Sequence, residues 1–259
     1  MDPNNLFDVS GKTALVTGAS GGIGLMIAGS LVDAGCRVLI CSRDLEQITA
    51  VADDLSARGS AIPFAADLST PEGISRASEA VGTGNPLHIL VNNAGAMFGA
   101  PIEQFPRSGF EDILNLNLIA PFELTKALLP SLRLAASRHD PARIINISSA
   151  GAIIVPEWDG YSYTASKAGL IHLSRHLGKA LAGEHITVNC IAPGYFPSKM
   201  TESLLGEDGT PTDEPFPLLG GRSGTPEDMA GAVIYLTSRA GAWISGHTIP
   251  LAGGLGTIS

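Results

Sequence analysis

Residues 17–24 read Thr-Gly-Ala-Ser-Gly-Gly-Ile-Gly, and they follow the apolar run Ala14-Leu15-Val16. This pattern predicts a glycine-rich turn that leaves a strand and opens a helix. Such a turn lets backbone N–H groups approach a pyrophosphate without a Cβ in the way, and it places that charge at a helix N-terminus. Glycine-rich turns also close ordinary strand–helix loops, so the stretch by itself leaves cofactor binding and a plain turn as alternatives.

The composition is that of a folded globular protein. The chain has 259 residues, 44% of them apolar and 16% charged, with a formal net charge of −9. This length fits one α/β domain, and we expect a single domain over residues 1–259. No basic stripe is present, so we expect no nucleic-acid partner. No uncharged apolar run approaches the ~18 residues of a membrane span, so we expect no membrane partner.

Cysteine use and the first residues bear on the compartment. Cys36, Cys41 and Cys190 are odd in number and lie in apolar, strand-like contexts, as reduced core thiols do. The polar start, Met1 to Asn5, does not have the pattern of a secretory signal. We therefore expect a cytoplasmic protein. The low share of charged residues also favours a homo-oligomer.

Short apolar runs alternate with longer helical patterns along the chain. The runs are nearly continuous in apolar residues, which is typical of parallel strands buried on both faces. Repeated strand–helix units of this kind predict a doubly wound α/β sheet with helices on both faces. The expected strands are Thr13–Thr17, Arg37–Cys41, Ala61–Ala66, His88–Asn92, Arg143–Ser148, Thr187–Ile191 and His247–Leu251. The expected helices are Ile23–Ala34, Leu45–Arg58, Glu72–Val81, Phe110–Ala136, Tyr163–Ala182 and Pro226–Ser238.

The stretch 195–224 breaks this alternation. It contains Pro197, Pro211, Pro215 and Pro217 together with several glycines. A loop of this length in a compact domain is usually functional or disordered. We favour a lid over a substrate pocket, with a mobile surface excursion as the alternative.

Several polar residues are candidates for chemistry. Tyr163 and Lys167 are four residues apart in a helical pattern and therefore share one face. A lysine ammonium near a phenol lowers the tyrosine pKa from its usual ~10, so that the phenol can exchange a proton with a substrate oxygen. A solvent-facing pair is the alternative.

Other candidates follow strands or interrupt a helix. Ser149 or its neighbour Ser148 lies at a strand end, where a hydroxyl can donate to a ligand carbonyl or simply cap a turn. Asn92-Asn93-Ala94-Gly95 follows another strand and suits a backbone packed against a ligand, or a plain turn. Asn117 is a poor residue for a helix interior, so it has either a structural hydrogen bond or a role in holding Lys167 through water.

Together these motifs resemble the short-chain dehydrogenases/reductases, in order and in spacing, over about residues 11–254. The motifs that carry the resemblance are Thr17-Gly18-x3-Gly22-x-Gly24, Asn92-Asn93-Ala94-Gly95, Asn117, Ser149, Tyr163-x3-Lys167 and Pro193-Gly194. The resemblance implies a single Rossmann-type domain with a seven-stranded parallel sheet. It also implies a homotetramer built through the two long helices, Phe110–Ala136 and Tyr163–Ala182.

The resemblance also implies roles for individual residues. Tyr163 would be the general acid/base, and Lys167 would tune it while holding the nicotinamide ribose. Ser149 would polarise the substrate carbonyl, Asn117 would support a proton-relay water, and Asp67 would contact adenine. No metal is implied. The expected cofactor-binding residues are Gly18, Ser20, Gly22, Ile23, Gly24, Ser42, Arg43, Asp67, Leu68, Asn93, Ala94, Gly95, Tyr163, Lys167, Pro193, Gly194 and Phe196.

The end of the second strand indicates which nicotinamide cofactor binds. An acidic side chain there would bind a ribose 2′-hydroxyl and repel a 2′-phosphate. The sequence instead places Ser42 and Arg43 at the strand tip, a hydroxyl and a guanidinium fork that suit a phosphate. We therefore expect NADP(H) in preference to NAD(H).

Apolar residues near strand ends and in the long loop favour an apolar or aryl ketone, or an acyl chain, as substrate. The stretch Glu184–Thr201 resembles the 3-oxoacyl reductases of the rhamnolipid-pathway type. We expect an NADPH-dependent carbonyl reductase that acts on a 3-oxoacyl thioester or an apolar ketone. The alternatives are an NAD-dependent secondary alcohol dehydrogenase and a non-catalytic cofactor sensor. The retained Tyr163 and Lys167 disfavour the sensor.

Overall fold

A seven-stranded parallel sheet forms the centre of the computed structural model, which describes residues 3–206, 209–212 and 218–255. The strand order is β3-β2-β1-β4-β5-β6-β7, and every neighbouring pair is parallel. The strands are β1 (Thr13–Thr17), β2 (Arg37–Ser42), β3 (Ser60–Ala65), β4 (Ile89–Asn92), β5 (Ala142–Ile147), β6 (Ile186–Pro193) and β7 (Thr248–Leu251). The order reverses at β1 and β4, so a ligand crevice is expected at the carboxyl ends of these two strands.

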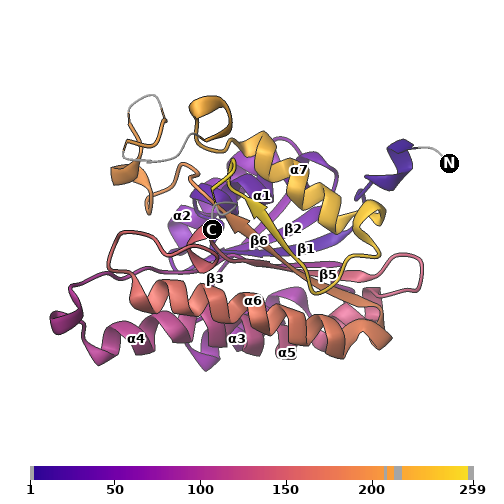
Figure 1. The fold of residues 1–259 in the computed structure, drawn as a ribbon. Coiled ribbons are helices and arrows are strands. Elements are labelled where there is room, and N and C mark those ends of the chain that lie inside the picture. Colours follow the sequence, from indigo (N-terminus) through magenta and orange to yellow (C-terminus); the bar gives the residue numbers. More distant parts are fainter. Residues whose placement is uncertain (1–2, 207–208, 213–217, 256–259) are drawn as a thin grey trace.

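Helices cover both faces of the sheet, as Figure 1 shows. On one side lie α1, α2 and α7, and on the other lie α3, α4, α5 and α6. The helices are α1 (Gly22–Asp33), α2 (Leu45–Ser56), α3 (Pro71–Val81), α4 (Arg107–Leu114), α5 (Ala120–Ala135), α6 (Tyr161–Leu181) and α7 (Pro226–Thr237). The predicted doubly wound sheet is confirmed. No helix within the described ranges is both long and apolar enough to cross a membrane.

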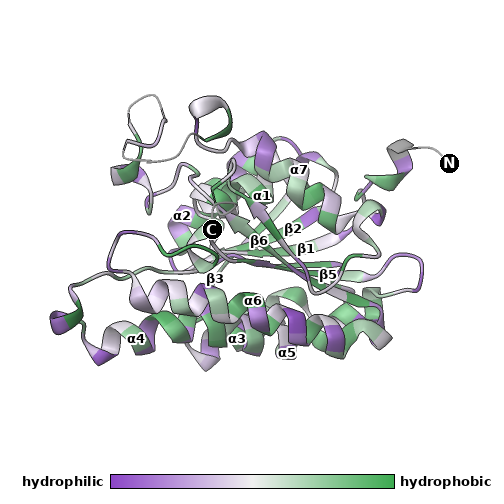
Figure 2. Cartoon of the chain, in the orientation of Figure 1, coloured by the Kyte–Doolittle hydropathy of each residue, from purple (hydrophilic) through white to green (hydrophobic). Residues whose placement is uncertain are grey.

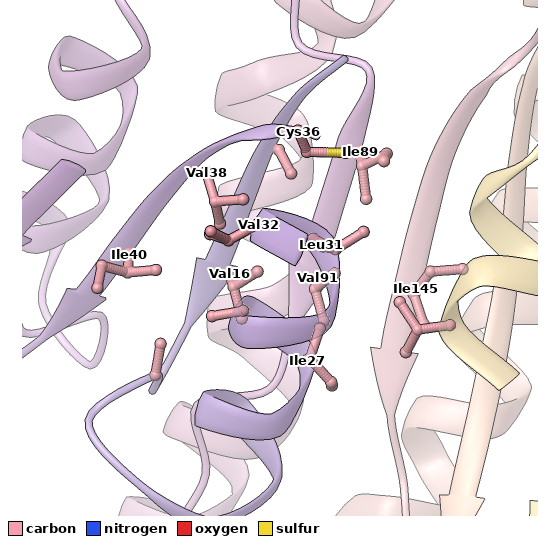
Figure 3. Packing of buried hydrophobic residues seen from close by; sticks show 14 of the residues in the cluster. Val16, Ile27, Leu31, Val32, Cys36, Val38, Ile40, Ile89, Val91 and Ile145 are labelled. Atoms are coloured by element: carbon pink, nitrogen blue, oxygen red, sulfur yellow. The ribbon is translucent and has the colours of Figure 1, made fainter. Parts of the chain in front are cut away.

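The hydrophobic core has two layers because side chains of a strand alternate between its faces. Val16 and Ile40 point toward α1, where Ile27 and Leu31 pack against them (Figure 3). On the other face, Leu15 belongs to a second cluster with residues of α3, α5 and α6. The apolar colouring of the strands in Figure 2 reflects this double burial. It explains why the strand segments lack polar alternation in the sequence.

The predicted helix Phe110–Ala136 is the main departure from the expected secondary structure. Helical backbone does cover this region, but a π-helical turn at Asn115–Ile119 separates α4 from α5. Two asparagines in this turn use their side chains for contacts outside the helix: Asn115 donates to the carbonyl of Ser69, and Asn117 contacts Ala96. A π-turn of this kind commonly marks a functional position.

The other predicted boundaries agree with the structure to within about two residues, with the differences at the ends, where elements fray. The stretch 195–224 is not uniformly irregular, because short 3₁₀ turns occur at Glu202–Leu204 and Leu219–Gly221. Its residues 207–208 and 213–217, including Pro215 and Pro217, lie outside the described residues.

A partly buried ionic cluster lies at the amino ends of the strands. The carboxylate of Asp140 accepts from the ammonium of Lys12 at 2.9 Å and from the guanidinium of Arg143 at 3.1 Å. The two cations also donate to carbonyls at the C-terminus of α7, those of Leu236, Thr237 and Ser238. Cations at this end of a helix satisfy its free carbonyls and complement its dipole. The cluster therefore joins β1, β5 and α7.

Asp140→Asn should destabilise the fold. The change leaves Lys12 and Arg143 without their carboxylate, and Arg143 is completely buried. Burial alone already lowers the pKa of both cations, which shows that their charges are costly to keep in this environment. The Asp140 side chain is 36% exposed, so we expect the free energy of unfolding to fall by about 1–3 kcal/mol, between the ranges for exposed and buried ion pairs. Urea denaturation followed by circular dichroism measures the loss.

Asp33→Asn is the matched control. It removes the partner of Arg58, and both of these side chains are 48% exposed. An exposed pair contributes less than about 1 kcal/mol. Equal losses in the two variants would show that burial does not set the strength of the Asp140 cluster.

Candidate active site

A cleft of about 430 Å³ opens at the carboxyl ends of the strands. It gathers residues from the turns after β1, β2, β3 and β4, from α6, and from the loop after β6. The predicted residues that line it are Gly18, Ser20, Gly22, Ile23, Gly24, Ser42, Arg43, Asp67, Leu68, Asn93, Ala94, Gly95, Tyr163 and Lys167. Its lining residues extend from the tip of β2 to the start of α6. A dinucleotide-binding crevice lies at this place in such a sheet.

The glycine-rich turn after β1 is packed too closely for side chains. A Cβ on Gly24 would overlap the carbonyl oxygen of Gly18. A Cβ on Gly18, whose φ is +64°, would lie 2.8 Å from the Cα of Ala94. Helix α1 starts directly after this turn, and its N-cap, Gly21, has no side chain to satisfy the first N–H groups. These N–H groups are therefore suited to hold a phosphate at the helix N-terminus.

Thr17 and Asn93 join the turn after β1 to the turn after β4. The Thr17 hydroxyl accepts from the backbone N–H groups of Asn93 at 2.9 Å and Ala94 at 3.0 Å. In return, the Asn93 amide donates to the carbonyls of Thr17 at 2.9 Å and Gly18 at 3.0 Å. The two turns that form the floor of the cleft are thus fixed to each other by four hydrogen bonds.

The tip of β2 presents Arg43 at the edge of the cleft, exposed to solvent. Its charge contributes to lowering the pKa of Asp67, although the hydrogen bond from Ser69 is the larger cause. The nearby acid, Asp44, is used elsewhere: its carboxylate caps α2 by accepting from the N–H of Gln47 at 3.0 Å. The Ser42 hydroxyl donates to the carbonyl of Asp44 at 2.8 Å. Among the described residues no carboxylate forms a salt bridge with Arg43, so its guanidinium is available to a phosphate at this tip.

Lys167 lies buried at the other end of the cleft. Its ammonium donates to the carbonyl of Ile147 at 2.8 Å and lies 5.8 Å from the centre of the Tyr163 ring. Burial lowers the pKa of Lys167 to about 8. The ammonium is therefore charged at neutral pH, and the end of β5 holds it. The alternative interpretation, a pair that faces solvent, is not what the structure shows.

The expectation that Lys167 lowers the pKa of Tyr163 is wrong for this structure. The pKa of Tyr163 is raised because burial disfavours the phenolate. A hydrogen bond with the Ser149 side chain opposes this shift only in part. The lysine ammonium faces a backbone carbonyl rather than the phenol oxygen, which explains why its charge does not prevail.

The structure separates the two serines that follow β5. Ser148 is buried, and its hydroxyl donates to the carbonyl of Lys167 at 2.8 Å. Ser149 hydrogen-bonds the phenol of Tyr163, and its oxygen also accepts from the N–H of Gly151 at 3.1 Å. Ser149 is therefore the serine that accompanies the phenol, and Ser148 positions the helix that carries Lys167.

Asn117 lies in the π-helical turn, and its side chain binds the backbone of the turn after β4. Its side chain accepts from the N–H of Ala96 and donates to the carbonyl of Ala96, both at 2.9 Å, and it also donates to the hydroxyl of Ser166. A Cβ on Gly95 would lie 3.1 Å from the Asn117 oxygen and 3.4 Å from the Lys167 ammonium. Asn117 therefore makes the structural hydrogen bonds that were one of its two expected roles. Its side chain and that of Lys167 both lie close to Gly95.

Pro193, Gly194 and Phe196 are not among the residues that line the cleft. The N–H of Gly194 donates to the carbonyl of Leu251, and a Cβ there would lie 2.9 Å from the Cα of Ala252. Phe196 is buried, and its ring fills the space next to Gly224. These positions serve the contact of β6 with β7 and the packing beneath the loop.

Other lining residues were not among the expected cofactor-binding residues. Ser198 packs on the glycine-rich turn, where a Cβ on Gly22 would lie 2.8 Å from the Ser198 Cβ. No local pattern predicts this contact, because it depends on the loop after β6 folding back over α1. The remaining residues of this group are Gly21, Cys41, Gln47, Ala66, Ala96, Leu116, Ile147, Ser148, Lys199 and Met200.

Comparison with known proteins agrees with this geometry. The family model of the short chain dehydrogenases matches residues 12–208. The rhamnolipids biosynthesis 3-oxoacyl-acyl-carrier-protein reductase of Pseudomonas aeruginosa is 46% identical over 249 residues, which are 96% of this chain and 97% of that protein. The 3-oxoacyl-acyl-carrier-protein reductase FabG of Rickettsia bellii is 34% identical over 250 residues, 96% of this chain and 99% of that one.

Among solved structures, the Pseudomonas aeruginosa RhlG/NADP active-site complex superposes with a TM-score of 0.90. It is 44% identical in sequence, and the match covers 99% of this chain and 100% of that one. The family model spans more than half of the chain, and the relatives match almost its full length. By sequence and by fold, this chain belongs to the short chain dehydrogenase family.

Proposed function

We propose that this protein is an NADPH-dependent carbonyl reductase that converts a ketone into a secondary alcohol. The observation that carries the proposal is the group formed by Ser149, Tyr163 and Lys167 beside a cleft with a glycine-rich floor. The named functions of the relatives, a 3-oxoacyl-acyl-carrier-protein reductase and an NADP complex of RhlG, support it.

The dinucleotide, when bound, supplies the hydride. Tyr163 donates a proton to the substrate oxygen as negative charge develops there, and Ser149 donates a hydrogen bond to the same oxygen. The raised pKa of Tyr163 keeps the phenol protonated at neutral pH, as an acid must be. Lys167 holds its charge next to the ring, and Asn117 fixes the backbone of Ala96 at the edge of the cleft.

The cofactor preference is supported by the tip of β2. Arg43 lines the cleft with a guanidinium that suits a 2′-phosphate, and the carboxylate of Asp44 is engaged in capping α2. The first N–H groups of α1 and the turns around Gly18 and Asn93 would hold the pyrophosphate and ribose groups.

The substrate pocket is proposed to lie next to Tyr163, with the stretch 195–224 as its lid. Exposed apolar side chains come from the loops that follow β4, β5 and β6. They favour an apolar ketone or the acyl chain of a 3-oxoacyl thioester. These side chains are Met97, Phe98, Ile153, Val155, Met200 and Leu204.

We also propose a cytoplasmic homotetramer. Ile119, Phe122 and Leu134 lie between α4 and the end of α5 and are 51%, 39% and 60% exposed, although all three are large and apolar. Such side chains favour an interface with another copy of the chain. The three cysteines, Cys36, Cys41 and Cys190, are free thiols, which suits a reducing compartment.

Tyr163→Phe should lower kcat for ketone reduction by about 10²-fold or more, because the general acid is lost. The affinity for NADPH, measured by fluorescence titration, should stay within about twofold. Tyr161→Phe is the matched control, because this tyrosine lies on the same helix and its hydroxyl donates to Asp159 instead. Turnover retained in Tyr163→Phe would remove this residue from the acid role.

Arg43→Ala should raise the Michaelis constant for NADPH about tenfold or more, because a charge-assisted hydrogen bond contributes roughly 1.5–3 kcal/mol. The Michaelis constant for NADH should stay nearly constant, since NADH lacks the 2′-phosphate. Arg37→Ala, at the opposite end of the same strand, is the control. Equal effects of Arg43→Ala on both cofactors would contradict the NADP assignment.

Light scattering should give a mass about four times the 26.7 kDa of one chain. Phe122→Glu should lower that mass, because an interface would bury an unpaired carboxylate. Phe7→Glu, which changes another exposed aromatic residue far from α5 in sequence, should leave the mass unchanged. A monomeric native protein, or no effect of Phe122→Glu, would contradict an interface at α5.

A further inference from the structure

The indole of Trp158 occupies a fixed place beside the Tyr163 ring. Trp158 precedes α6 in the loop after β5, and the two ring centres are 5.6 Å apart with planes tilted by 47°. The six-membered edge of the indole lies against two glycines. A Cβ on Gly160 would overlap its Cη2 and Cζ3 atoms, and a Cβ on Gly99 would lie 3.3 Å from its Cε3 atom. The side chain is therefore seated in a slot that only glycines leave open.

This seating leaves the polar part of the indole on the other edge. The five-membered ring, with its Nε1–H, is opposite the edge that faces Gly99 and Gly160. Within the described residues, Nε1–H has no hydrogen-bond acceptor. In the same residues, four buried side-chain polar atoms have no hydrogen-bond partner, and all four are hydroxyls. The Trp158 Nε1 atom is not one of them. The indole N–H is therefore left without a protein acceptor on a ring whose centre lies 5.6 Å from that of the Tyr163 ring.

The Trp158 indole differs from the exposed apolar side chains near the strand ends because it carries a hydrogen-bond donor. Several large apolar side chains are exposed near the strand ends, among them Met97, Phe98, Ile153 and Val155. Trp158 combines a large apolar body with one polar group, which is how tryptophan commonly contributes orientation in a binding pocket. A substrate with a single carbonyl would use Ser149 and Tyr163 and leave the indole N–H without a partner.

We propose that the Trp158 indole N–H donates a hydrogen bond to a second carbonyl oxygen of the substrate, in the position β to the ketone. This inference rests on the proposed function and specifies its substrate class as 3-oxo esters or thioesters. In O=C–CH₂–C=O the two oxygens are only a few bonds apart. One oxygen can contact Tyr163 while the other contacts a donor on the neighbouring ring. Trp158 thereby orients the ketone and selects 1,3-dicarbonyl substrates over simple ketones.

Trp158→Phe tests the proposal, because it keeps an aromatic ring in the slot and removes the N–H. Ethyl acetoacetate and 2-heptanone have chains of equal length, and only the first has the second carbonyl. We expect the ratio of kcat/KM for ethyl acetoacetate to kcat/KM for 2-heptanone to fall about tenfold, as loss of one hydrogen bond predicts. The N-acetylcysteamine thioester of acetoacetate should behave like the ester.

Trp243→Phe is the control, because this side chain is 99% exposed and should leave the ratio unchanged. An unchanged ratio in Trp158→Phe, or an equal loss for both substrates, would overturn the proposal and leave Trp158 with a packing role. Failure of the wild-type enzyme to reduce any ketone is a different result, because it would contradict the proposed function itself.

A binding measurement tests the same contact without turnover and without changing Trp158. The chain has two tryptophans, so Trp243→Phe leaves the emission of Trp158 alone. In the presence of NADP⁺, ethyl 3-hydroxybutyrate should shift this emission to longer wavelength as the indole N–H gains an acceptor, and 2-heptanol should not. The same response to both alcohols, or no response to either, would overturn the proposal.

Discussion

The close contact between the turn after β1 and the turn after β4 is the constraint on which the site depends. Gly18 and Gly24 allow these backbones to approach, and the side chains of Thr17 and Asn93 fix them with hydrogen bonds. A single Cβ in this contact would push the turns apart. The same contact fixes the start of α1 at the cleft and sets the position of Ala94, so the proposed phosphate site and its neighbouring wall are built together.

The end of the cleft near Tyr163 contains a charge that burial disfavours. Lys167 is buried, and burial lowers its pKa to about 8, yet the carbonyl of Ile147 at the end of β5 holds the ammonium. Tyr163 experiences the same poor solvation, and its pKa is raised. Low solvation therefore favours a protonated phenol in the described structure. It also strengthens the polar interactions that a substrate oxygen would make there.

Support for these groups comes from residues that fix the surrounding backbone. Asn117 interrupts a long helix with a π-turn and uses its side chain to hold Ala96. At the amino ends of the strands, Asp140 forms ion pairs with two cations that also bind the end of α7. Trp158 is seated by Gly99 and Gly160 against the Tyr163 ring. In each case a polar or aromatic side chain fixes the position of a segment that the hydrogen bonds between strands do not constrain.

The sequence by itself determined the sheet, the glycine-rich turn and the approximate places of Tyr163, Lys167 and Arg43, because these follow from local periodicity and from motifs with fixed spacing. It also identified Asn117 as a residue that a regular helix would not favour. The tertiary structure decided the pKa direction of Tyr163, the separate hydrogen-bond partners of Ser148 and Ser149, and the burial of Phe196 beneath the loop. It also decided the contact of Ser198 with Gly22. Burial, hydrogen-bond partners and loop packing depend on residues far apart in the chain, and no local pattern contains that information.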